Sequence, residues 1–283
     1  MKDLIVTTCT NIGSGNNIFE YKLPSQQTFN NAEIRLVEAS MRYSWKNITA
    51  AYNNNVIAYR WINGTIVTIT LPDSFLTIEE INLALVAEMT TQTHYLLNAD
   101  GDGVFYIAIA NNIPRYAVQV VCSPLPTALG TLTYPAGNTW TLPATTLVPS
   151  LRILANSFTD IIGYVAGDYP SSAILTTSQS FLSTYTPNVT PVSTVGLTCN
   201  IISGYGTSTQ QTSGIFSAAD VSSFGGFIVK TFDSDLWAEL QNTSTDRIEF
   251  RLVDQLNRPV QILDLNGILF RFVIRSPSDY GRG

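Results

Sequence analysis

An unbroken period-two alternation of apolar and polar side chains runs from Val37 to Lys46, and it constrains the fold more than any other feature of the chain. Successive side chains of a β-strand point to opposite faces, so this alternation predicts a strand with one buried face. The side chains expected on that face are Val37, Ala39, Met41, Tyr43 and Trp45. The chain therefore needs a sheet with a core beneath it.

Two further apolar runs, residues 56–62 and 65–71, are separated only by Asn63 and Gly64. This dipeptide is the favoured composition of a two-residue type I′ turn, in which both central residues need positive φ. The sequence therefore predicts an antiparallel hairpin with that turn. The three asparagines at 53–55, in the connection that leads into the hairpin, predict a tight turn, because asparagine tolerates left-handed backbone.

One helix is expected among the strands. Thr77 and Glu80 have the spacing of a capping box, and the apolar residues that follow predict a helix over about residues 77–92. Its apolar positions are Ile81, Leu83, Leu85, Val86 and Met89. His94, the only histidine, is expected at the helix end in a capping or surface role, since no nucleophile turn of the GxSxG type accompanies it.

Further antiparallel strands are predicted on both sides of an irregular middle. Residues 104–110 and 115–122 form one apolar pair, and residues 195–202, 225–232, 247–253 and 268–275 supply strands near the end of the chain. Residues 124–190 are rich in proline, threonine and serine, and we interpret them as a loop-rich elaboration of a sheet.

These elements predict an all-β fold, a single jelly-roll β-sandwich with one inserted helix and long Pro/Thr-rich loops. One domain is expected over residues 1–283, with residues 1–17 as a candidate N-terminal arm and residues 276–283 as a C-terminal tail. The strand pattern before and after the proline-rich middle does not divide visibly into two cores.

The chain is poor in charge. Charged residues make up 13% of the sequence, about half of the roughly 25% usual in soluble domains, and the formal net charge is -6. Uncharged hydroxyl and amide surface costs less to desolvate than charged surface, which favours burial against partners. The acidic balance and the absence of a basic run exclude tight binding of nucleic acid through its phosphates.

No targeting or membrane segment is expected. The sequence has no apolar stretch of about 18 residues and no recognisable signal peptide, so we expect a reducing compartment. The three cysteines, Cys9, Cys122 and Cys199, are widely spaced without a CxxC motif. We interpret them as free buried thiols and expect neither a disulfide framework nor a zinc site.

Residues 98–103 imitate the opening of a calcium loop, with oxygen-bearing side chains at Asn98, Asp100 and Asp102. The twelfth position of that loop is Ile109, where an EF-hand needs a bidentate glutamate, so the segment is interpreted as a turn and no metal is expected. The glycine-rich residues 13–17 precede no helix and are interpreted as a flexible turn, not a phosphate loop.

Carboxylates that could converge on a catalytic cleft are Asp73, Glu79, Glu80, Asp233 and Asp235. Glu80 already has a role in the capping box, and residues 233–235 have the composition of a turn. We therefore expect no catalytic residue, no cofactor and no enzymatic activity.

Four glycosylation sequons occur, at Asn47, Asn63, Asn188 and Asn242. With no signal peptide recognised, they are interpreted as a by-product of a Thr- and Ser-rich β composition and not as glycosylation sites.

Seven sequence motifs, taken in their order along the chain, are similar to those of a known family. The motifs are SWKNIT (44–49), YNNN (52–55), LPDSFLTIEEINLAL (71–85), HYLL (94–97), YIAIANNIPRYAVQV (106–120), TPVSTVGLTCNII (190–202) and FRLVDQLNRPVQILDLNGILFRFVI (250–274). Their order resembles the minor capsid, or penton, proteins of virophages, Mavericks/Polintons and polinton-like viruses, over about residues 33–275.

The resemblance implies a single jelly-roll protein that forms homopentamers at the five-fold vertices of an icosahedral capsid. Its implied partners are copies of itself and a double jelly-roll major capsid protein, with other minor capsid proteins as further candidates. Assembly inside a host cell and a place in the virion follow from the same resemblance, whereas the residues of the interfaces do not.

Two other functions stay open at this point. The same β pattern suits another capsid component, such as a cement protein or a single jelly-roll major capsid protein. A β-sandwich module that binds glycans or receptors is suggested by the Asn-rich loops and by four tryptophans, Trp45, Trp61, Trp140 and Trp237. Trp45 falls on the apolar face of its predicted strand, however, which favours a place in the core.

Overall fold

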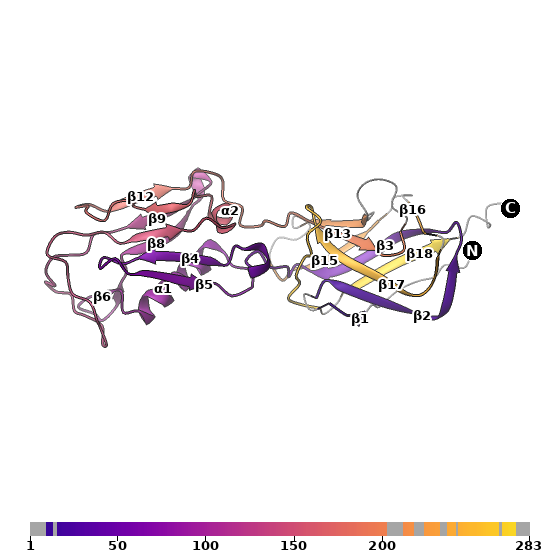
Figure 1. Cartoon of the computed structure of the whole chain (residues 1–283), viewed down its shortest axis with the longest axis horizontal. Coiled ribbons are helices and arrows are strands. Elements are labelled where there is room, and N and C mark those ends of the chain that lie inside the picture. The colour runs from indigo at the N-terminus through magenta and orange to yellow at the C-terminus, as the bar shows by residue number, and fades with distance from the viewer. Residues whose placement is uncertain are drawn as a thin grey trace. The chain divides into compact units, whose positions relative to one another are not determined.

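The chain forms two compact units in the computed structural model, which describes residues 10–13, 16–202, 212–217, 224–232, 237–241, 243–265 and 268–275. Residues 1–46 and 192–283 make up the first, here called the framework unit, and residues 47–191 make up the second, the inserted unit. Figure 1 shows the framework unit built from the two ends of the colour scale and the inserted unit from its middle.

The described strands of the framework unit belong to two antiparallel sheets. The first has the order β1 (Thr10–Asn11), β2 (Ile18–Phe29), β17 (Thr243–Asp254), β13 (Thr194–Cys199) and β14 (Thr212–Ser217). In the second, β3 (Glu33–Arg42) pairs with β18 (Leu269–Arg275), and β15 (Phe227–Thr231) and β16 (Ala238–Glu239) also pair with β3. Aromatic side chains join the sheets, since Phe250 of β17 stacks on Phe272 of β18 with ring centroids 4.3 Å apart.

The strand pairs of this unit are nested along the chain. The outer pair is β2 with β17, the next is β3 with β15, and the innermost is β13 with β14. Such nesting arises when one long antiparallel hairpin folds over into two sheets, which is how a jelly roll is connected. The structure thus confirms the predicted all-β jelly-roll class.

A single domain over residues 1–283 was expected, and within the chain residues 47–191 form a compact unit of their own between β3 and β13. Period-two patterns reveal strands and their buried faces, but they do not say which core a strand belongs to. The expected arm over residues 1–17 also differs, since Thr10 and Asn11 pair with β2. Residues 1–9 and 276–283 lie outside the described residues.

The strand predicted from the alternation is β3, although it begins earlier and carries a bulge. Its pairing with β18 skips Val37, so Ile34 and Leu36 are buried before that point, and Ala39 and Met41 after it. Tyr43 and Trp45 are buried as predicted, while Val37 is half-buried because it is the extra residue of the bulge.

The inserted unit, described throughout, combines small sheets with two helices. One sheet has the order β11 (Gly167–Tyr169), β10 (Ser150–Ile153), β4 (Val56–Arg60) and β5 (Ile66–Thr70). Another has the order β12 (Gln179–Leu182), β9 (Ala117–Cys122) and β8 (Ile107–Asn112), and β6 (Leu96–Leu97) pairs with β7 (Gly103–Val104). The remaining elements are α1 (Ile78–Thr91), α2 (Phe158–Ile162) and the 3₁₀ turns η1 (Ala50–Tyr52) and η2 (Ile113–Arg115).

Two local predictions in this unit are confirmed, and each needs a correction. The β4–β5 hairpin forms, but only Gly64 has positive φ (86°), and its N–H donates to the carbonyl of Trp61 at 2.9 Å. The loop is therefore not a two-residue type I′ turn, in which both central residues have positive φ. It is a longer loop, which needs a left-handed residue at its last position only. The capping box of α1 is complete, but the apolar positions named for this helix do not share one face, since Leu83 is 63% exposed whereas Ile81, Leu85 and Met89 are buried.

Candidate functional site

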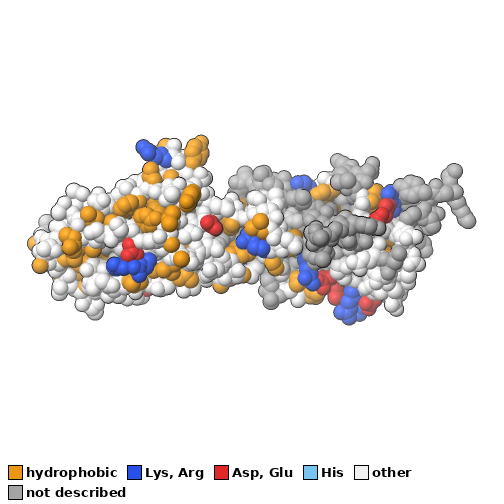
Figure 2. Space-filling model, turned by 45° about the horizontal axis from the view of Figure 1, so that its top comes forward, with side chains coloured by type: hydrophobic (Ala, Val, Ile, Leu, Met, Phe, Trp, Pro, Cys, Tyr) orange, Lys and Arg blue, Asp and Glu red, His pale blue; other side chains and the backbone are white. Residues whose placement is uncertain are grey.

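Charge is distributed unequally between the two units. The inserted unit has three arginines, no lysine and eight carboxylate side chains, so it accounts for five of the six net negative charges. Figure 2 shows the difference on one face, where apolar and uncharged side chains cover most of the unit on the left. A surface of this kind is suited to protein contacts.

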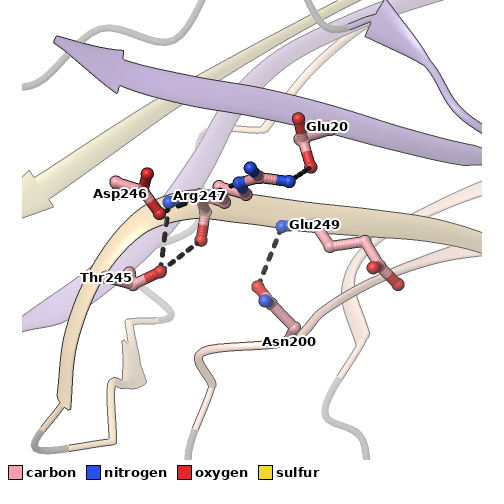
Figure 3. Close-up of polar contacts among 6 residues, drawn as sticks. All are labelled: Glu20, Asn200, Thr245, Asp246, Arg247 and Glu249. Atoms are coloured by element: carbon pink, nitrogen blue, oxygen red, sulfur yellow. Dashed lines mark hydrogen bonds and ion pairs between the residues drawn. The ribbon is translucent and has the colours of Figure 1, made fainter. Parts of the chain in front are cut away.

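The outer face of β2 and β17 in the framework unit is, in contrast, strongly charged. Figure 3 shows the guanidinium of Arg247 beside Glu20, with Nη1 and Oε2 3.4 Å apart, next to a bulge in β17. At this bulge the backbone N–H of Arg247 donates to Oγ1 of Thr245 at 3.0 Å, and Oγ1 donates to the carbonyl of Arg247 at 2.8 Å. On the same strand Arg251 pairs with Glu249 at 2.6 Å, so each of these two arginines has a carboxylate partner.

The other sheet of the framework unit carries apolar side chains on its outer face. Phe227 and Val229 of β15 are 48% and 60% exposed, whereas Ile228 between them is buried. Arg42 of β3 lies 5.9 Å from the centroid of the Phe227 ring and forms an ion pair with Asp264 at 3.1 Å. A strand that is apolar on both faces is typical of one that is covered in an assembly.

The structure places His94 in the core, so the predicted surface role is wrong, although its backbone N–H caps the end of α1 by donating to the carbonyl of Met89 at 2.8 Å. Its side chain stacks on Trp61 with ring centroids 4.6 Å apart, and its Nδ1 lies 2.8 Å from the hydroxyl of Tyr59. Burial lowers the pKa of His94 to about 4, partly offset by the negative charge of Glu88. A neutral histidine packed among aromatic rings has a structural role.

Residues 98–103 form the turn of the β6–β7 hairpin, as predicted. Oδ1 of Asn98 accepts the N–H groups of Asp100 and Asp102 at 3.0 and 2.7 Å, and Gly101 has a φ of 87°. The asparagine side chain thus organises the turn itself. Within the described residues, no group of three or more His, Cys, Asp or Glu side chains has a metal-binding arrangement.

The carboxylates considered for catalysis have separate structural partners. Asp73 accepts from the hydroxyl of Thr49 at 2.9 Å, Glu79 accepts from Asn111 at 2.7 Å, and Glu80 closes the capping box. Asp233 and Asp235 lie outside the described residues. Asp168, which the sequence did not single out, binds Arg152 at 2.6 Å and Arg60 at 3.0 Å, which lowers its pKa.

Buried asparagines hold the start of the inserted unit. The Nδ2 group of Asn47 donates to the carbonyls of Leu76 and Val189, at 2.8 and 2.7 Å, and its Oδ1 accepts from the N–H of Leu76. At 2% exposure Asn47 is inaccessible to glycosylation in the folded chain. Asn53 has a φ of 52°, which confirms the predicted tight turn.

The other sequons and the cysteines can be placed only in part. Asn63 and Asn188 are exposed, and Asn242 lies outside the described residues. Cys122 is a free, buried thiol, as predicted, and Cys199 is also buried, whereas Cys9 lies outside the described residues. Burial raises the pKa of Cys122 to about 12, so its thiol stays protonated.

The tryptophans offer little support for a glycan-binding face. Trp45, Trp61 and Trp140 are buried, at 2%, 1% and 5% exposure. Trp237 is half-buried, and the guanidinium of Arg275 lies 3.8 Å from its ring centroid. None of the three buried rings can serve as a platform for a sugar.

The β8–β9 hairpin ends in the most exposed apolar side chains of the inserted unit. Ile113 and Tyr116 are 77% and 81% exposed, and Arg115 between them is also exposed. The turn is well defined, because the N–H of Tyr116 donates to the carbonyl of Ile113 at 3.1 Å. The motif NNIPRY marked this turn in the sequence, but nothing in its pattern showed that these side chains stand outside the core.

Comparisons with known proteins find likenesses among solved structures, of which two are described here. One is the mavirus penton protein, with 10% identity over 97% of this chain and 98% of that one, at a TM-score of 0.44. The other is from the structure of the Sputnik virophage, with 11% identity over 99% of both chains, at a TM-score of 0.35. No protein-family model and no curated protein matches the sequence. In the described part of the chain, no helix has the length and apolar character needed to span a membrane.

Proposed function

We propose that this chain is a penton protein, a structural component that forms homopentamers at the five-fold vertices of an icosahedral capsid. The observation that carries the proposal is the ordered set of motifs. The motif SWKNIT (44–49) spans the point where the chain passes from the framework unit into the inserted unit. The motif TPVSTVGLTCNII (190–202) spans the point where it returns. Residues 250–274 supply the end of β17 and most of β18.

The surfaces of the chain support a role in assembly. The inserted unit has a low density of charge, and both units expose large apolar side chains, which contacts in an assembly would cover. Five copies can close a ring through one repeated heterologous interface, in which two different patches of the same chain meet. Such a ring needs no catalytic group, cofactor or metal.

The partners follow from the same proposal. In a capsid the ring would contact a double jelly-roll major capsid protein around the vertex, with other minor capsid proteins as further partners. The net charge of the chain, -6, disfavours tight binding of the genome through its phosphates. The chain would be part of the virion, and the capsid would be assembled inside the host cell.

The number of copies in the purified protein tests this function. Native mass spectrometry and analytical ultracentrifugation should give a species of five chains. A trimer would favour a different capsid component. A stable monomer that binds glycans would favour a binding module.

A further inference from the structure

The hairpin tip formed by residues 113–116 has a cation that no acidic group of its own unit neutralises. Arg60 and Arg152 are both paired with Asp168, but Arg115 makes no hydrogen bond or ion pair within residues 47–191, all of which the structure describes. It lies between the exposed side chains of Ile113 and Tyr116. The tip therefore presents one free cation between two apolar side chains.

The tip is held in one conformation, as a docking element should be. Tyr116 has a φ of 49°, and its N–H donates to the carbonyl of Ile113. Across the hairpin, Nδ2 of Asn112 donates to Oε1 of Gln119 at 2.8 Å. A pre-ordered tip loses little conformational entropy on binding.

A surface of complementary chemistry lies elsewhere on the same unit and is here called the acidic–aromatic patch. The half-buried rings of Tyr95 and Phe105 stack with centroids 5.2 Å apart at the base of the β6–β7 hairpin, whose turn carries the exposed Asp100 and Asp102. A Cβ at Gly103 would lie 2.8 Å from the ring of Phe105, so the glycine lets that ring pack close to the turn. The carboxylate of Asp100 has no partner within residues 47–191.

Tip and patch lie toward opposite ends of α1. Asn111, at the tip side, binds Glu79 in the first turn of the helix at 2.7 Å, while Tyr95 follows Thr91, the last residue of the helix. A helix of 14 residues is about 20 Å long. A contact between the two surfaces therefore joins two copies of the chain.

We propose that the tip of one copy docks on the acidic–aromatic patch of the next copy. Arginine pairs with carboxylates and also stacks on aromatic rings, so Arg115 fits both components of the patch. Ile113 and Tyr116 would cover the rings of Tyr95 and Phe105. Because the two surfaces differ, the contact is heterologous and can generate a closed ring. This inference rests on the proposed function, whose interface it names.

Charge reversal tests the contact. Arg115→Glu, and separately Asp100→Arg, should raise the protein concentration needed for half-assembly by about tenfold or more, as expected for a central arginine. The double variant Arg115→Glu/Asp100→Arg should restore assembly, because it exchanges the two charges. Ile174→Glu is the matched control, since it adds a negative charge at a side chain that is 74% exposed on the same unit.

Tyr116→Asn tests the apolar part of the tip without straining its backbone, because asparagine tolerates positive φ. Circular dichroism should show every variant folded. Two outcomes would overturn the docking contact and leave the penton function intact. In the first, the wild type is a pentamer and the single variants assemble equally well. In the second, the single variants lose assembly and the double variant does not restore it. A wild type that stays monomeric at all concentrations would overturn both.

Discussion

Acidification should destabilise the inserted unit through His94. The imidazole is buried against Trp61 and Tyr59, and its pKa is lowered from 6.5 to about 4 because burial penalises its charged form. The unfolded chain takes up a proton as the pH falls through 6.5, whereas the folded chain stays neutral until the pH reaches about 4. The free energy of unfolding should therefore be highest above pH 7 and fall between pH 6.5 and 4.

The size of this effect follows from the two pKa values. One pKa unit corresponds to about 1.4 kcal/mol. The pKa of His94 differs by about 2.5 between the unfolded and the folded chain, so the largest loss in the free energy of unfolding is about 3 kcal/mol. At pH 5 roughly 2 kcal/mol of this should already be lost. The measurement is hydrogen exchange of peptides from residues 56–61 and 117–122 at several pH values, since these strands report on the core of the inserted unit.

The control is His94→Gln, which keeps a polar group near the hydroxyl of Tyr59 but does not titrate in this range. Its stability should change much less between pH 7 and 5, although it is lower overall. Exchange rates of the wild-type protein that stay constant between pH 7 and 5, after correction for intrinsic chemistry, would contradict this role of His94. The same pH dependence of stability in His94→Gln would also contradict it.

Three further changes should affect folding and can be measured by urea denaturation. Trp45→Ala should cost about 3 to 5 kcal/mol because the ring is 2% exposed, and Trp45→Phe should cost clearly less; a near-neutral alanine variant would contradict the core position. Gly163→Ala should cost at least about 2 kcal/mol, because Gly163 has a φ of 73° and a Cβ there would overlap the carbonyl of Tyr185; unchanged stability would show that this turn is different. Asp168→Asn should cost about 1 kcal/mol and less at high salt, since it leaves two arginines without their carboxylate, and a salt-independent loss would argue against an ionic cause.

Local features of the fold could be predicted from the sequence because each depends on a few neighbouring residues. The capping box placed α1 to within a residue at either end, and the alternation after Val37 identified the buried face of β3. The turn at 98–103 was also recognised, because an asparagine side chain and a glycine suffice to build it. These predictions needed no knowledge of distant parts of the chain.

Features that depend on distant contacts could not be predicted in the same way. The two cores are invisible to periodicity, since strands from either unit alternate alike. The burial of His94 depends on Tyr59 and Trp61, more than thirty residues away in sequence, and an exposed Leu83 looks no different in sequence from a buried one. The candidate interface was missed because the sequence of the turn at residues 111–114 does not show which of its side chains are exposed.

The most direct test of the penton function is a cryo-EM map of particles that contain this chain, at a resolution sufficient to recognise its jelly roll and inserted unit. A penton protein should give five copies around every five-fold axis, with density for the framework unit and the inserted unit in each copy. Density for this chain only at other positions, such as beneath the facets or within the hexagonal capsomers, would contradict it.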